Sequence, residues 1–196
     1  MLRILPYCHP ALRFESRPVA IIDDHLRTIV REMFGLMYAA KGIGLAANQV
    51  GLPYRFFVLN TTADPAKPED ERVFLNPEIV KRHSSIVGEE GCLSFPSLYA
   101  NVQRARKIKV HAFDLNGQSF EVEAEDLLSR AIQHETDHLD GTLFIDRLTP
   151  DLFEKVEAKV RGFEVDFRKL QAIGEYDSDD DILKGLRDHK PGDPIP

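Results

Sequence analysis

The stretch Gln133-His134-Glu135-Thr136-Asp137-His138 decides how the whole chain is interpreted. Two histidines four residues apart project from the same face of an α-helix, because four residues make about one helical turn. Two neutral imidazoles can bind a divalent metal ion, and the carboxylate of Glu135 can take a proton from a metal-bound water. The stretch therefore predicts a metal-binding helix with a base beside the metal.

The residues around this stretch predict that the helix is buried. A helix from about Glu125 to Leu139 places both histidines and Glu135 on faces that are otherwise mostly apolar, and Gly141 ends it. The alternative is a pair of buried histidines that only bind the backbone. Clustered polar groups are costly to bury without a partner, and the adjacent carboxylate weakens that alternative. We expect the histidines to point inward and to hold a metal.

Length and composition limit the class of protein. A chain of 196 residues suits one domain with a sizeable core, and 43% hydrophobic with 29% charged residues is ordinary for a globular protein. No apolar run approaches the roughly 18 residues of a membrane span, and residues 1–6 lack the apolar segment of a signal peptide. We expect a cytoplasmic protein without membrane attachment. The net charge of -7 argues against a broad nucleic-acid surface.

The rest of the chain predicts a mixture of helices and strands. Residues 1–20 show little periodicity and predict an extended arm. Asn116-Gly117 is typical of a hairpin turn, and Pro77 indicates an edge strand or a bulge. The other predicted elements are helices over 23–42, 125–139 and 150–170 and strands over 55–60, 73–80, 108–112 and 120–122.

These elements predict an α+β fold. Mixed, mainly antiparallel strands surround the central metal-binding helix, and a C-terminal helix packs outside it. We expect residues 1–172 to form the catalytic domain. Residues 173–196 form an acidic, proline-containing tail, which we expect to be poorly ordered or loosely docked.

The third metal ligand separates the enzyme classes that share this motif. A metzincin protease would carry a third histidine six residues after His138, where the chain has Phe144. A thermolysin-like protease would use a downstream glutamate, and Glu154, Glu157 and Glu164 are candidates by sequence distance. Each of these glutamates is more simply explained by a solvated position on the C-terminal helix.

Cys92 is the stronger candidate for the third ligand. It follows Gly91 in a stretch unlike its polar surroundings, and a thiolate would complete a Cys–His–His set with a fourth position left for water. The alternative is a small buried thiol, which is common. Cys8, in a proline-bounded arm, keeps that alternative interpretation, and two cysteines make a thin disulfide framework for a domain of this size.

Three stretches together resemble the peptide deformylase family. They are Gly42-Ile43-Gly44-Leu45-Ala46-Ala47-Asn48-Gln49, Glu90-Gly91-Cys92-Leu93-Ser94 and Gln133-His134-Glu135-Thr136-Asp137-His138. The resemblance covers about residues 3–170, and the three motifs in this order are highly specific. It implies a metal-dependent hydrolase in protein biosynthesis, which removes the N-formyl group from the N-terminal formyl-methionine of newly synthesised polypeptides and releases formate.

The resemblance also implies roles for individual residues. Glu135 would accept the proton of the attacking water and deliver it to the leaving amine. The oxyanion would be stabilised by the side chain of Gln49 and the backbone N–H of Leu93. Without the resemblance, a solvent-facing amide is the alternative for Gln49. The implied metal ligands are Cys92, His134 and His138.

Substrate contacts follow from the resemblance as well. The nascent peptide would bind as an extended strand against Ile43-Gly44 and the turn at Gly91, which gives main-chain affinity with little sequence demand. The methionine side chain would enter an apolar pocket lined by Ile43 and Ile132.

The ligand set does not decide the metal, because Cys–His–His suits zinc, iron, nickel or cobalt. The resemblance implies one divalent ion per chain, with Fe2+ in cells and Zn2+, Ni2+ or Co2+ in isolated protein. It also suggests transient contact of the C-terminal helix with the ribosome. The acidic residues interspersed on that helix favour a solvated charged face equally.

Two other functions stay open from the residues alone. One is a zinc endopeptidase that uses a downstream glutamate. The other is a non-enzymatic binding module with a structural metal, which would need a closed fourth ligand position. No fourth protein ligand is found near the motifs.

Overall fold

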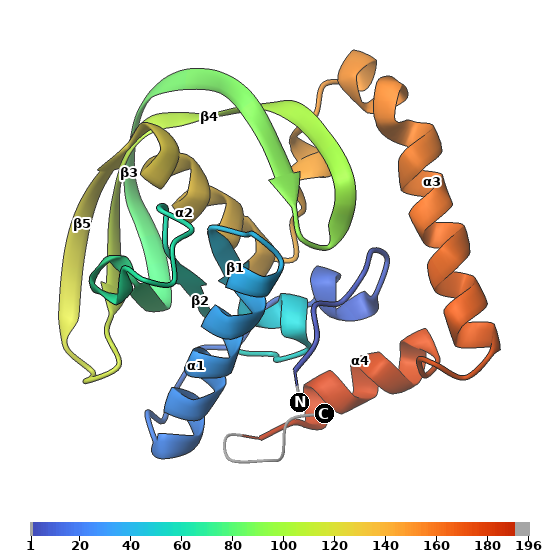
Figure 1. Ribbon diagram of the computed structural model, residues 1–196, viewed down its shortest axis with the longest axis horizontal. Helices are drawn as coiled ribbons and strands as arrows, with labels where there is room; N and C mark the ends of the chain where they lie inside the picture. The colour runs from blue at the N-terminus through green and yellow to red at the C-terminus, as the bar shows by residue number, and fades with distance from the viewer. Residues whose placement is uncertain (1, 191–196) are drawn as a thin grey trace.

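Helix α2 (Asp126–Leu139) is enclosed by a curved antiparallel sheet in the computed structural model, which describes residues 2–190 (Figure 1). The sheet has the strand order β1-β2-β3-β4-β5, and every neighbouring pair is antiparallel. Its strands are β1 (Gly44–Ala46), β2 (Phe56–Leu59), β3 (Arg72–Cys92), β4 (Phe95–Phe113) and β5 (Ser119–Glu125). The predicted α+β fold with a central helix is confirmed.

The hairpin of β3 and β4 dominates the sheet and arches over α2 (Figure 1). The sequence predicted a strand of residues 73–80 only, and the structure continues it to Cys92. Residues 81–87 are all exposed and pair only with β4, so they lack the alternation that marks a half-buried strand. The register shifts between Leu75 and Glu78, as the bulge predicted at Pro77 requires.

Two apolar clusters fix the sheet between its helices. Helix α1 (Asp24–Ala39) begins after Asp23, whose carboxylate accepts a hydrogen bond of 2.8 Å from the Leu26 N–H. The buried face of α1 packs on β1 and β2. A second cluster joins Ala131, Ile132 and Leu139 of α2 to the facing sheet residues. Helix α2 is therefore packed against the sheet, and Ser129 and Gln133 also form hydrogen bonds with the backbone of Ala105 in β4.

The C-terminal part lies outside this core. Helix α3 (Pro150–Ala172) begins with a proline, as predicted, and buries only Val160 and Phe167. Helix α4 (Asp179–Asp188) follows it and lies beside the N-terminal arm (Figure 1). Within residues 2–190, no helix is long and apolar enough to span a membrane.

The expectation of a poorly ordered or loosely docked tail is wrong for α4. Leu186 is buried against Leu5 and Ala11 of the N-terminal arm. The guanidinium of Arg17 donates hydrogen bonds to the carbonyls of Leu186 (3.0 Å) and His189 (2.7 Å), which satisfies the end of the helix. The acidic composition hid a short apolar face. Residues 191–196 lie outside the described part of the chain.

Candidate metal centre

The chain brings three predicted metal ligands together from two elements. Cys92 is the last residue of β3, and His134 and His138 lie one turn apart on α2. Their ligand atoms all lie within 4.8 Å of one another, and Cys92 Sγ is 3.3 Å from His138 Nε2. Within residues 2–190 this is the only group of three such side chains that could hold a metal ion.

The orientation of His134 fits a metal ligand. Its Nδ1 lies 3.0 Å from Glu90 Oε2, so a neutral ring donates its proton there and leaves the Nε2 lone pair toward Cys92 and His138. Burial by itself raises the pKa of the Glu90 carboxyl, but hydrogen bonds from His134 and Arg104 outweigh burial and hold that pKa well below its usual range. Glu90 is therefore a charged acceptor that fixes the ring.

A buried ion network supports Glu90. Arg104 donates two hydrogen bonds of 2.9 Å to the Glu90 carboxylate and a third to Asp137, next to the second ligand histidine. Asp137 also pairs with Arg147 at 2.7 Å, and Arg130 donates to Glu90 at 2.7 Å. Charges removed from water cost free energy unless they are paired in this way. Sequence analysis missed these arginines, because no local spacing relates each of them to its carboxylate partner on another element.

Glu135, the predicted base, lies on α2 between the two histidines. Its carboxylate is buried, and its Oε2 has no hydrogen-bond partner within the described residues. Burial raises the pKa of Glu135 to about 7. Gly44 lies directly against it, since a Cβ atom at Gly44 would be 2.4 Å from Glu135 Oε1. A glycine is needed here so that β1 can approach the carboxylate.

Gln49 points its amide group into the same site. Its side chain is 1% exposed, which excludes the solvent-facing alternative. Its Oε1 accepts a hydrogen bond of 2.9 Å from the Ala46 N–H, so the NH2 group faces the other way. That group donates to Cys92 Sγ (3.5 Å) and Ser94 Oγ (3.3 Å). The amide is fixed before any substrate arrives.

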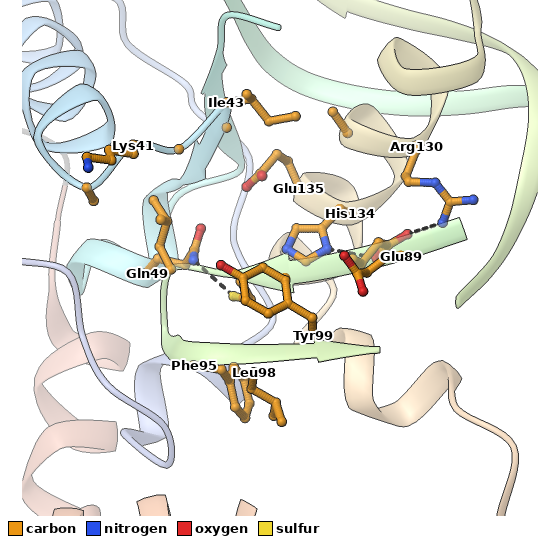
Figure 2. Close-up of a pocket in the computed structure, with 18 of the residues that line it drawn as sticks. Lys41, Ile43, Gln49, Glu89, Phe95, Leu98, Tyr99, Arg130, His134 and Glu135 are labelled. Carbon is orange, nitrogen blue, oxygen red and sulfur yellow. Dashed lines mark hydrogen bonds and ion pairs between the residues drawn. The ribbon is translucent and has the colours of Figure 1, made fainter. Parts of the chain in front are cut away.

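A cavity of about 610 Å³ opens over these groups (Figure 2). Figure 2 shows Glu135, His134 and Gln49 directed toward it, with Ile43 and Lys41 on one side and Tyr99 on another. The cavity lining includes five residues that were predicted to contact the substrate or stabilise the oxyanion: Ile43, Gly44, Gln49, Gly91 and Leu93.

Ile132 departs from the prediction for the methionine pocket. It is fully buried in the cluster that faces the sheet and does not line the cavity. Each step along an α-helix turns the side chain by about 100°. The preceding residue, Ala131, therefore faces the cavity instead, and Leu127 lies one turn before it.

The geometry defines a class of protein. A thiol and two imidazoles can share one divalent ion, a buried carboxylate lies beside them, and a cavity admits a substrate. These are the parts of a metal-binding hydrolase.

Comparison with known proteins names the family. The profile described as "Polypeptide deformylase" matches residues 1–153. Peptide deformylases of Rhodopirellula baltica and Acidobacterium capsulatum are 40% and 42% identical over 173 residues, which is 88% of this chain and 86% and 97% of theirs. A crystal structure of peptide deformylase from Plasmodium falciparum has a TM-score of 0.83 at 40% identity and covers 85% of this chain and 98% of its own.

The chain belongs to the polypeptide deformylase family. It is a hydrolase that removes the N-formyl group from formyl-methionine at the start of newly synthesised polypeptides, as the sequence predicted. The endopeptidase and the non-enzymatic binding module are therefore excluded as its function.

Proposed function

We propose that Cys92, His134 and His138 bind one divalent metal ion and that Glu135 carries the proton during hydrolysis of the formyl group. The observation that carries this proposal is the unpartnered Glu135 carboxylate, buried beside the only Cys–His–His group of the described chain. When bound there, the ion would act as a Lewis acid that makes water a nucleophile near neutral pH.

Glu135 accounts for the proton balance of the reaction. Water adds to the formyl carbon, and the Glu135 carboxylate takes one of its protons. The carbon–nitrogen bond then breaks, and Glu135 returns the proton to the leaving amine nitrogen. The products are formate and a free N-terminal amine. The unpartnered Oε2 leaves one carboxylate oxygen available for this transfer.

Gln49 and Leu93 stabilise the negative charge that develops on the formyl oxygen. The Gln49 NH2 group is held by the hydrogen bond from Ala46 to its carbonyl oxygen, so it needs no reorganisation when charge appears. The Leu93 backbone N–H follows Cys92 in the turn between β3 and β4. Two donors fixed in advance favour the tetrahedral intermediate over the planar formamide.

The substrate peptide lies as an extended strand between two walls of the cavity. The free edge of β1, with Ile43 and Gly44, forms one wall, and Gly91 forms the other. A Cβ atom at Gly91 would lie 2.6 Å from the Tyr99 ring, so this position must stay small. The methionine side chain packs against Ile43, Leu127 and Ala131, which are the apolar residues near Glu135 in the cavity lining.

The metal in cells is Fe2+, with Zn2+, Ni2+ or Co2+ able to replace it in isolated protein. A thiolate with two imidazoles accepts each of these ions. A thiolate at a ferrous site is also open to oxidation, which favours anaerobic handling.

We place the enzyme in the cytoplasm, where it meets formylated chains as they leave the ribosome. Residues 1–172 form the catalytic domain, and residues 173–196 are an extension to it. Contact of α3 with the ribosome would bring the enzyme to its substrate. Deleting residues 151–196 tests this contact by co-sedimentation with ribosomes, provided that the remaining core stays folded.

The substitution Glu135→Gln tests the proposed mechanism. The amide keeps the size of the side chain but cannot accept the water proton, so we expect a metal-loaded protein with formate release lowered at least about 100-fold. Metal content by plasma emission and formate release from formyl-Met-Ala-Ser are measured on the same sample. Hydrolysis at the wild-type rate by the metal-loaded variant would show that Glu135 is not the proton carrier.

A further inference from the structure

A second cavity, of about 350 Å³, lies between the N-terminal arm and the C-terminal segment. It shares no lining residue with the metal centre. Residues 174–189 form much of its wall and lie beyond residues 1–153, which match the family profile. Its size is within the range of small-molecule sites. Its apolar lining consists of Leu2, Leu5, Val50, Tyr176, Ile182 and Leu186.

His9 presents an unused hydrogen-bond donor at this cavity. Its side chain is only 7% exposed, and its Nδ1 accepts a hydrogen bond of 3.1 Å from the Ala11 N–H. A neutral ring therefore carries its proton on Nε2. Burial lowers the pKa of His9 to about 4, so the ring is neutral near pH 7. No hydrogen bond formed within residues 2–190 uses Nε2, and this atom is not fully buried, so it is free to donate to a ligand in the cavity.

A second imidazole nitrogen is also unpartnered at this cavity. His189 lines the cavity, and its Nδ1 lies 3.0 Å from the Tyr54 hydroxyl. Its Nε2 is buried and has no hydrogen-bond partner within the described residues. His9 therefore supplies the free ring donor at the cavity, and His189 lies in the wall where its ring signals can report on binding.

The rim of the cavity carries uncompensated negative charge. Asp177 and Asp181 line it, and neither forms an ion pair within residues 2–190. The one cation of the lining is Arg3, which pairs with Glu175 at 3.0 Å and lies 4.3 Å over the Tyr176 ring. A ligand that fits must present a positive group to the rim, an acceptor to His9 and an apolar body to the walls.

We propose that this cavity binds an N-terminal residue that has a free ammonium group and an apolar side chain, of which methionine is the type. The ammonium lies at Asp177 and Asp181, the carbonyl oxygen accepts from His9 Nε2–H, and the side chain packs on the apolar walls. This is the group that deformylation creates, whereas the formylated substrate has no charge at that nitrogen. The link to the product rests on the deformylase function, but the binding itself does not.

Histidine NMR tests the proposal on the metal-loaded full chain. L-Methioninamide is titrated while the ring C–H signals of His9 and His189 are followed, with N-acetyl-L-methioninamide as the uncharged control. We expect both signals to shift with methioninamide, and the acetylated compound to bind at least about tenfold more weakly. Equal affinity for both compounds, or no shift with methioninamide, would overturn the proposal.

Two variants connect the shifts to the assigned contacts. His9→Asn keeps an acceptor for the Ala11 N–H but removes the Nε2–H donor, and the double variant Asp177→Asn with Asp181→Asn removes only the exposed charges. We expect each to weaken methioninamide binding at His189 about fivefold to tenfold. Formate release serves as the independent check and should stay at the wild-type rate. Asparagine at position 181 keeps an oxygen that can accept from the Ser178 hydroxyl at the start of α4. Wild-type affinity in the double variant would also overturn the proposal.

Discussion

Helices α2 and α3 are both amphipathic in sequence, but they use their polar residues in opposite ways. From Ser129 to Leu139 every residue of α2 except Arg130 is buried, including both histidines and Glu135. The 23 residues of α3 bury only Val160 and Phe167, and its charges face solvent. A polar side chain buried on a helix needs a specific partner, whereas an exposed one does not. The comparison shows where a charge has a function and where it only solvates the surface.

The two helices should differ most in the loss of stability that follows when a charged partner is removed. Arg104→Met leaves Glu90 and Asp137 buried with fewer partners, and we expect the free energy of unfolding to fall by about 3–5 kcal/mol. Equilibrium urea denaturation measures it. The matched control on α3 is Arg161→Ala, which removes an exposed ion pair with Glu157 and should leave the free energy of unfolding nearly unchanged, because water screens such pairs. Similar losses in the two variants would contradict the comparison.

A substitution at Gly44 tests, through enzyme activity, whether the buried Glu135 of α2 needs a specific position. Gly44→Ala places a methyl group against the Glu135 carboxylate, and we expect formate release to fall at least about 100-fold because the displaced carboxylate no longer meets the water proton. The assay is kcat/KM on formyl-Met-Ala-Ser. An unchanged rate would mean that the position of Glu135 is less critical than its contacts with β1 indicate.

The free energy of unfolding should depend on pH through His9, which lies where α3 contacts the N-terminal arm. His9 packs edge-on against Phe167 of α3, and its depressed pKa of about 4 means that the unfolded chain binds a proton more readily. Stability is therefore lost as pH falls through 6.5 toward 4, by about 2 kcal/mol between pH 7.5 and pH 5. Urea denaturation at both pH values measures the loss. The variant His9→Asn should lack this share of the pH dependence, and an identical pH profile in both proteins would refute the assignment.

The smallest effect is expected at Gly162 in α3, where nothing lies within 4 Å of an added Cβ. Gly162→Ala should raise the free energy of unfolding by about 0.5–1 kcal/mol, because alanine loses less backbone entropy in a helix. Formate release should not change. Thermal denaturation measures the gain in stability. A destabilised or inactive variant would show that α3 has a contact at Gly162 that the structure does not reveal.

The sequence predicted α2 with its two histidines and Glu135, because local spacing determines where these residues lie on the helix. His134 and His138 share a face through helical geometry, and the apolar residues on the neighbouring faces of the helix predict burial. Cys92 was chosen by elimination and by resemblance, and the structure places it 3.3 Å from His138 Nε2. Pro77 predicted an edge strand or a bulge because a proline cannot donate to the ladder, and the register of β3 shifts between Leu75 and Glu78.

Interactions between distant parts of the chain could not be predicted in this way. The Arg104–Glu90 pair joins residues on two long strands, and its register is set by tertiary pairing. The cavity faces Ala131 rather than Ile132, because the rotation of α2 depends on packing against the sheet. Docking of α4 depends on Leu186 meeting Leu5, which is 181 residues earlier (186 − 5). Each case needs a contact that no local pattern encodes.

The most direct test of the account is the metal content of anaerobically purified wild type and Cys92→Ala, measured together with formate release. We predict one metal ion per chain and formate release in the wild type, and near-complete loss of both in the variant, because two histidines alone leave the site without its thiolate. A folded Cys92→Ala protein that keeps a full metal ion and releases formate at the wild-type rate would contradict the assignment of this site.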